Sequence, residues 1–199
     1  MSKTTRKWVL AGVLLVVLAT LAVSVKRNIA FELGNKPSDA IPIHDERKPA
    51  GIMVFCYHRV LDDNKVVRLD ERLSPNSQFH DFNVNLSDFK RQMATLARDH
   101  VKVISTAQMV QLVESHRRIH GRYVVLTFDD IDRTTVDNAA PVMIKHHFPF
   151  TISVITGNTG EYRAGTKLAT WPQIMTMKKK AGALLTFGVH TNNMHYLNR

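Results

Sequence analysis

Short apolar runs alternate with helical patterns along residues 51–199, and this alternation restricts the fold more than any other feature. The runs are rich in β-branched and apolar residues without a helical period, which is typical of buried strands. They lie at 52–58, 101–104, 123–126, 150–155 and 183–187. The segments between them repeat apolar residues at helical spacing, as in the predicted helix 135–147. The order predicts right-handed crossovers and a parallel sheet or barrel.

The number of strands restricts the architecture further. Five strands do not close a barrel, for which about seven or eight are usual. The chain also stops at Arg199, before any helix follows the last predicted strand. We therefore expect an α/β fold of the (β/α) barrel type that is incomplete at its C-terminus.

The N-terminal segment differs from the rest of the chain. Trp8 to Val25 carries no charge, follows Lys3, Arg6 and Lys7, and is long enough to span a membrane. Small residues at 22–24 also suit signal cleavage, so a retained anchor and a cleaved signal both remain open, with the anchor favoured.

These features give a predicted domain organisation. Residues 1–7 form a basic cytoplasmic leader and 8–25 a transmembrane anchor or signal segment. Residues 26–50 are polar, contain three prolines and form a linker, and 51–199 form one domain. A leading apolar segment before a single domain predicts that the domain lies on the extracellular face of the membrane, anchored or secreted.

The chain is strongly basic, with a formal net charge of +10 and a pI near 9.9. Its basic residues are scattered in short groups such as Arg117-Arg118 and 178–180. No helix-turn-helix or RNA-binding signature accompanies them, so we expect no nucleic-acid partner. On an exported protein such a surface suits anionic lipid or wall polymer, and solvated helix faces account for many of these lysines.

Two polar motifs follow predicted strands directly. Thr127-Phe128-Asp129-Asp130 ends one strand, and His190-Thr191-Asn192-Asn193-Met194-His195 ends another. The carboxyl ends of parallel strands meet at one edge, where the sites of open α/β sheets and barrels lie. Asp130 and His190 could therefore converge although 60 positions separate them.

These residue types suit a metal centre. On a regular helix His190 and His195 would point about 140° apart, so a turn after the strand must bring them together. Two imidazoles and one carboxylate, with an open fourth position, are the usual ligands of catalytic zinc. Of two adjacent carboxylates, one can bind the metal while the other accepts a proton.

The two motifs resemble the first and second motifs of the polysaccharide deacetylases, the NodB-homology domain of carbohydrate esterase family 4. The stretch Tyr57-His58-Arg59-Val60, residues 126–157 and the membrane leader resemble most closely the intercellular-adhesin biofilm polysaccharide N-deacetylases. The resemblance covers residues 51–199. It implies a distorted (β/α) barrel and hydrolysis of N-acetyl groups on an extracellular N-acetylglucosamine polysaccharide, in particular poly-β-1,6-N-acetylglucosamine.

The resemblance also implies residue roles. Asp130, His190 and His195 hold a divalent metal, usually Zn²⁺, with Co²⁺ or Ni²⁺ able to substitute, and Asp129 is the general base. The partners would be the N-acetylated polysaccharide and, through the N-terminal segment, the membrane. From their places after predicted strands, we interpret His58 and Asn158 as substrate-binding candidates, with a structural histidine and a simple turn as the alternatives.

The sequence departs from this family in two ways. Ile131 stands where the family often has glycine, and the later motifs that supply the groove walls and a general-acid histidine are not present before Arg199. A peptidoglycan or chitin deacetylase, or a non-catalytic metal- or glycan-binding remnant, therefore remain alternatives. The single cysteine, Cys56, lies in an apolar run, where we expect a buried, inert thiol.

Overall fold

The computed structural model describes residues 2–34, 50–73, 82–163 and 166–192, and these form two units. The first unit comprises Met1–Asp39 and Asn64–Asp81, with helices α1 (Lys3–Gly34) and α2 (Lys65–Leu73). In α1 the segment Thr4–Arg27 has a mean hydropathy of 2.6, and none of it is buried. It is long and apolar enough to cross a membrane, a property that signal sequences share.

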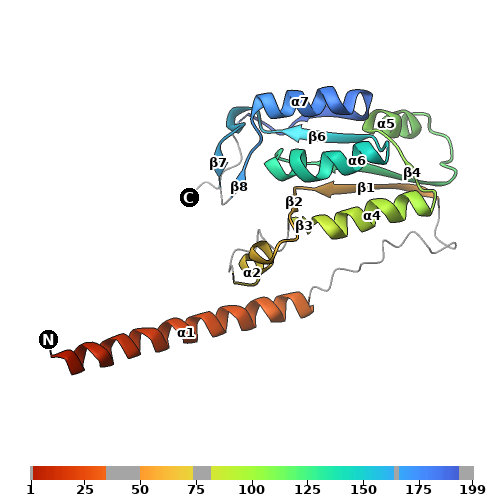
Figure 1. The fold of residues 1–199 in the computed structure, drawn as a ribbon. Coiled ribbons are helices and arrows are strands. Elements are labelled where there is room, and N and C mark those ends of the chain that lie inside the picture. The colour runs from red at the N-terminus through yellow and green to blue at the C-terminus, as the bar shows by residue number, and fades with distance from the viewer. Residues whose placement is uncertain (1, 35–49, 74–81, 164–165, 193–199) are drawn as a thin grey trace. The chain divides into compact units, whose positions relative to one another are not determined.

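The second unit is built on a five-stranded sheet whose strands all run parallel (Figure 1). Its strands are β1 (Gly51–Tyr57), β4 (Lys102–Val103), β5 (Arg122–Phe128), β6 (Phe150–Val154) and β9 (Leu185–Val189). β1 pairs with the whole of β5, while β4 and β6 pair with its first and second halves. β9 pairs with β6. The predicted parallel α/β fold with five strands is confirmed.

Helices connect the strands, and shorter elements border them. The helices are α4 (Leu86–Arg98), α5 (Thr106–Glu114), α6 (Ala140–Lys145) and α7 (Trp171–Ala181). The short helical turns are η1 (Thr135–Ala139), η2 (Thr156–Asn158) and η3 (Gly182–Leu184). β2 (Arg59–Leu61) pairs parallel with β3 (Asn83–Asn85), and β7 (Tyr162–Arg163) pairs antiparallel with β8 (Thr166–Lys167).

The predicted helix 135–147 is interrupted at its start. Residues 135–139 form a π-helical turn, and the α-helical part begins only at Ala140. Pro141 has no N–H to donate to the carbonyl of Asp137, so a regular α-helical turn is incomplete there. The wider turn brings Asn138 to the carbonyl of Val60, to which its Nδ2 donates at 2.7 Å.

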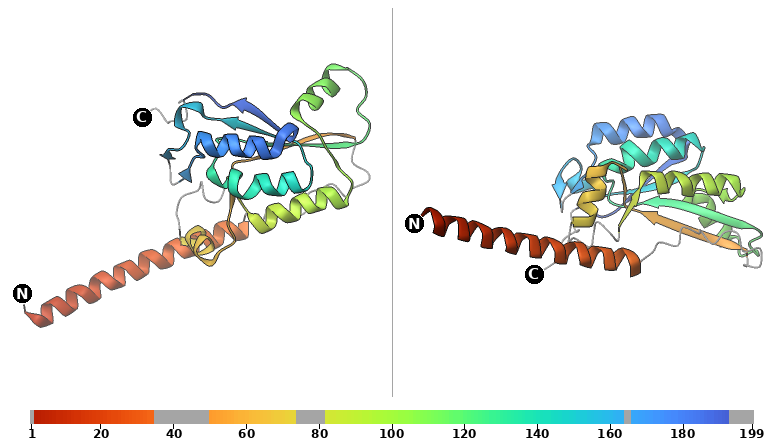
Figure 2. Two further views of the ribbon diagram at one scale, coloured as in Figure 1. Left: turned by 45° about the horizontal axis from the view of Figure 1, so that its top comes forward. Right: turned by 60° about the horizontal axis from the view of Figure 1, so that its bottom comes forward.

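The core lies between one face of the sheet and α4, α6 and α7, which Figure 2 shows together on that face. Phe128 of β5 is fully buried there, and its ring lies 5.3 Å from Tyr57, 6.0 Å from Phe89 and 6.4 Å from Phe150. Rings at these separations attract one another beyond their burial alone. The cluster fixes the last residue of β5, directly before Asp129.

The opposite face of the sheet is partly uncovered, and Val54 on it is 49% exposed. Alternation along β1 sends Phe55 and Tyr57 toward the core, so Cys56 points away from it. Cys56 is exposed, and the expectation of a buried thiol is wrong. A continuous apolar run cannot reveal which of its faces remains uncovered.

Candidate functional site

The end of β5 turns two adjacent carboxylates toward the carboxyl edge of the sheet. The N–H of Asp129 donates to the carbonyl of Tyr57 at 2.9 Å, so pairing with β1 extends one residue beyond the strand. Asp130 and Ile131 then adopt left-handed backbone angles, with φ of 70° and 57°. This region is unfavourable for a β-branched residue, and the full burial of the Ile131 side chain holds it there.

The end of β9 delivers His190 to the same place. Its N–H donates to the carbonyl of Val154 at 2.9 Å, which continues the pairing with β6, and Thr191 then turns the chain with φ of 61°. The Nε2 atom of His190 lies 3.3 Å from Oδ1 of Asp130. The side chains are 32% and 22% exposed respectively, so solvent reaches both. The structure therefore brings the two polar motifs together.

The turn after His190 is fastened to the segment after β6. The N–H of Thr156 donates to the carbonyl of Thr191 at 3.3 Å, and that of Gly157 to the carbonyl of Asn192 at 2.6 Å. The Thr156 hydroxyl donates to Oδ1 of Asn192 at 2.9 Å. A Cβ atom at position 157 would overlap the Asn192 carbonyl, so glycine allows this close approach.

Asp130 and His190 suit a divalent metal. In a tetrahedral zinc site with bonds of about 2.0–2.2 Å, two ligand atoms lie about 3.3–3.5 Å apart, which matches the Asp130–His190 separation. His195, the third predicted ligand, lies outside the described residues. Within the described ranges, no group of three His, Cys, Asp or Glu side chains gathers to hold a metal ion.

Asp129 is fixed by a neighbour that sequence reasoning assigned to the core. The Cys56 thiol donates to Oδ2 of Asp129 at 3.2 Å. Partial desolvation, together with the hydrogen bond and charge of Asp129, raises the pKa of the Cys56 thiol above its ordinary value. The thiol thus stays protonated at neutral pH and remains a hydrogen-bond donor to the carboxylate.

The other two candidates take different positions. His58 is half-buried directly after β1, its ring 5.0 Å from that of Phe82, and its carbonyl accepts a hydrogen bond from Thr135. Asn158 is only 2% exposed, and its Nδ2 donates to Glu161 at 2.7 Å. The turn at 156–158 accounts for this asparagine, and its contact with substrate stays a prediction.

Two buried charged residues beside the site were given no role from the sequence. Arg59 is 8% and Asp132 4% exposed. Asp132 accepts hydrogen bonds from the N–H and hydroxyl of Thr134. Burial raises the pKa of Asp132, an effect that these bonds and the positive charge of Arg59 oppose. The sequence signal for Asp132 was its position as a third carboxylate, directly after Asp129-Asp130 and Ile131. The sequence pattern alone cannot distinguish such a buried carboxylate from one in a solvated turn.

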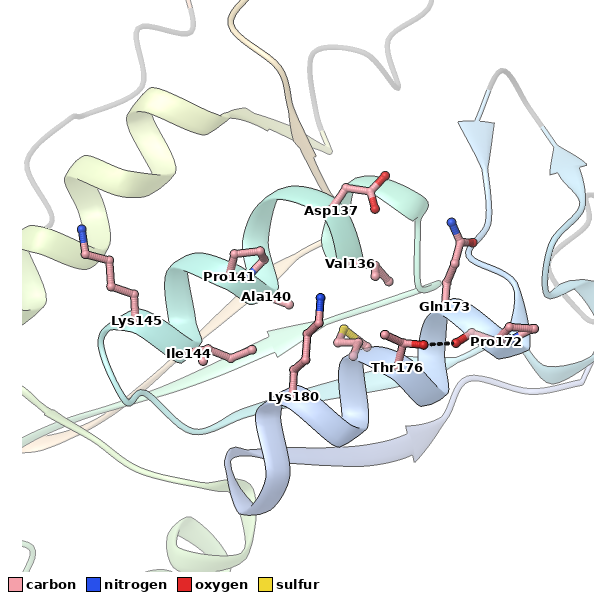
Figure 3. A pocket seen from close by; sticks show the side chains of 11 residues that line it. Val136, Asp137, Ala140, Pro141, Ile144, Lys145, Pro172, Gln173, Thr176 and Lys180 are labelled. Atoms are coloured by element: carbon pink, nitrogen blue, oxygen red, sulfur yellow. Dashed lines mark hydrogen bonds between the residues drawn. The ribbon is translucent and has the colours of Figure 1, made fainter.

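A groove of about 760 Å³ lies elsewhere, between η1–α6 and α7. Figure 3 shows Val136, Ala140 and Ile144 on one side and Pro172 and Thr176 on the other. None of the candidate site residues lines it. The groove is therefore distinct from the candidate site.

Known proteins share sequence with this chain. Residues 116–199 match the polysaccharide deacetylase family. Two curated relatives are poly-β-1,6-N-acetyl-D-glucosamine N-deacetylases. The protein from Staphylococcus epidermidis is 28% identical over 74% of this chain and 50% of its own length. The protein from Staphylococcus aureus strain MRSA252 is 26% identical over 76% and 52%. The chain thus spans about half the length of these relatives.

Solved structures share the fold. IcaB from Ammonifex degensii superposes with a TM-score of 0.62 at 28% identity, over 76% of this chain and 57% of that one. The Streptococcus pyogenes deacetylase PplD gives a TM-score of 0.56 at 23% identity, over 73% and 58%. The expected barrel-type fold and the resemblance to this family are confirmed.

Proposed function

Because the chain is a relative of the polysaccharide deacetylases, we propose that it hydrolyses N-acetyl groups of an extracellular N-acetylglucosamine polysaccharide, in particular poly-β-1,6-N-acetylglucosamine. The observation that carries the proposal is the approach of Asp130 and His190 to 3.3 Å beside Asp129, at the carboxyl edge of a parallel sheet. The names of the curated relatives support the choice of polymer.

Asp130, His190 and His195 would hold a divalent metal, with Zn²⁺ the best match to one oxygen and two nitrogen donors. When bound, such an ion supplies Lewis acidity and lowers the pKa of a coordinated water. The contribution of the chain itself is to hold two of these ligands in place. The backbone hydrogen bond of Asp129 to β1 fixes the chain directly before Asp130, and that of His190 to β6 fixes His190 itself.

Asp129 would act as the general base. Its Oδ2 accepts the thiol hydrogen of Cys56, which fixes the orientation of the carboxylate and leaves Oδ1 to accept a proton from the attacking water. Amide hydrolysis then yields acetate and a free amine on the sugar. A positioned base typically contributes about 10²–10⁴-fold to the rate of such a reaction.

The N-terminal segment would anchor the domain outside the cell. The apolar segment Thr4–Arg27 supports this part of the proposal by its length and hydropathy. A retained anchor would keep the domain at the membrane, close to polymer that leaves the cell.

The test is an amine-release assay with purified full chain on poly-β-1,6-N-acetylglucosamine, with chitin oligomers and peptidoglycan in parallel. We expect release from the first polymer, dependent on added Zn²⁺ and lost in His190→Ala. Faster release from either alternative would overturn the choice of substrate. Zn²⁺ bound at Asp130 and His190 with no release from any polymer would identify a non-catalytic binding protein.

A further inference from the structure

Basic side chains gather at the amino edge of the sheet, opposite the candidate site. In a parallel α/β fold the strands start and the helices end at this edge, so several separate segments meet there. Their exposed lysine and arginine side chains, here called the basic edge, are Arg98, Lys102, Arg117, Arg118, Arg122, Lys145, Lys179 and Lys180. Figure 3 shows Lys145 on α6 and Lys180 on α7.

Few negative charges accompany the basic edge. On the described segments that form it, the acidic residues are Asp99 and Glu114, and Asp99 pairs with Arg98 at 3.0 Å. Carboxylates gather at the opposite edge instead, at Asp129 and Asp130. The basic edge thus carries few carboxylates, whereas the carboxyl edge combines Asp129, Asp130 and Asp132 with Arg59 and Arg133.

Helix capping explains only part of this distribution. Basic residues in the last turns of α4, α6 and α7 interact favourably with helix C-termini. Lys102, Arg117 and Arg118 lie outside helices, where that stabilisation does not apply. Arg117 and Arg118 line a groove of about 520 Å³ whose walls include Leu112, His120 and Tyr123. The two guanidinium groups at this groove suit an anionic head group by their charge.

The covalent chain enters the domain at the same edge. Gly51 is the first residue of β1, and its N–H donates to the carbonyl of Gly121 at 3.0 Å, directly after the segment that carries Arg117 and Arg118. Residues 28–50, 23 residues in all, join the apolar segment of α1 to this point. Even fully extended they reach at most about 80 Å, so in an anchored domain the start of β1 stays within that distance of the bilayer.

From these observations we propose that the basic edge docks on an anionic phospholipid surface, with the carboxyl edge directed away from the membrane. The proposal rests on the anchoring given under the proposed function. It commits to lipid because the tether joins the domain at the basic edge and so raises the local concentration of lipid head groups there. Docking in this orientation holds Asp130 and His190 on the side of the domain that faces the polymer.

The test is hydrogen–deuterium exchange of the full chain in nanodiscs of phosphatidylcholine alone or mixed with phosphatidylglycerol. We expect phosphatidylglycerol to protect amides of 115–122 while leaving those of 129–132 unchanged. Since near-surface basic residues each contribute about fivefold to binding, Arg117→Gln with Arg118→Gln should lower the docked population about 30-fold at low salt. Rising salt should reduce protection in the wild type.

The matched control neutralises two exposed lysines away from the basic edge. Lys90→Gln with Lys167→Gln removes the same charge, from the first half of α4 and from β8, and should change protection by less than about twofold. Equal losses in both double variants would overturn the docking site, because net charge alone would then explain binding.

The remaining outcomes separate the hypotheses. Protection of 129–132 by phosphatidylglycerol, or none at 115–122, would overturn the proposed orientation. Protection of 115–122 by soluble poly(glycerol phosphate) but not by the phosphatidylglycerol discs would assign the basic edge to a wall polymer and overturn the lipid proposal. Failure of the chain to enter phosphatidylcholine discs would contradict the anchoring itself, and the amine-release assay tests the enzymatic proposal independently.

Discussion

Replacing Gly157 with alanine should loosen the turn that follows His190. A Cβ atom at this position would overlap the backbone carbonyl of Asn192, and a backbone atom cannot rotate away as a side chain can. One of the two segments must therefore move. The shift would strain or break the hydrogen bonds that join Thr156 and Gly157 to Thr191 and Asn192.

The size of the effect follows from those contacts. Three hydrogen bonds join the segments, and each contributes about 0.5–1.5 kcal/mol net. Because some will survive in a shifted geometry, we expect a loss of about 2–3 kcal/mol, which is in the range measured for overpacked sites. For a chain of this length the melting temperature should fall by about 4–12 °C.

The same change should weaken metal binding, because Thr191 and Asn192 directly follow one proposed ligand and lead toward His195. Interactions that orient the ligands of a metal site typically contribute about 10–100-fold to its affinity for the metal, and we expect zinc affinity to fall within that range. Thermal unfolding of the full chain in detergent and zinc titration measure the two effects. Gly188→Ala is the matched control, since its Cβ would meet Ser153 at an ordinary 3.5 Å. If both variants melted and bound zinc alike, the reasoning would be refuted.

Three further predictions concern the site and its support. Asp129→Asn should keep bound zinc while turnover falls about 10²–10⁴-fold, whereas Asp130→Ala should lose the metal as well. Wild-type turnover in Asp129→Asn would exclude Asp129 as the general base. Because the pKa of Cys56 is raised, iodoacetamide should label this thiol slowly at neutral pH and faster as the pH rises. The label adds bulk beside Asp129 and should therefore block turnover, so a labelled but fully active chain would contradict this prediction. Phe128→Ala should cost about 3–5 kcal/mol in urea unfolding, against about 0.5 kcal/mol or less for the more exposed Met175→Ala. Similar losses would contradict the described core.

The sequence predicts the main sheet well because its strands carry their own signal. β5 and β6 are continuous β-branched and aromatic runs, and each is buried by helices whose periodicity is equally clear. The approach of Asp130 to His190 follows from topology alone, since parallel strands bring their carboxyl ends to one edge. To predict this approach, it was enough to know that each residue directly follows a strand.

Other features depend on contacts that no local pattern encodes. The exposure of Cys56 depends on which face of β1 the helices cover. The burial of Asp132 depends on its hydrogen bonds from Thr134 and on the nearby positive charge of Arg59. The π-helical turn at 135–139 needs both the missing N–H of Pro141 and the hydrogen bond from Asn138 to Val60. Each arises only when distant segments meet.

A parallel sheet also separates two chemical environments by construction. The strands end with Asp130 and His190 at one edge, so the connecting helices end at the other edge. Basic residues such as Lys145 and Lys180 lie there, where they stabilise the helix C-termini and make the surface positive. One arrangement of strands thus places acidic and imidazole side chains opposite a cationic edge. If the proposed docking is correct, this geometry lets the domain bind a membrane at one edge and hold its site open to polymer at the other.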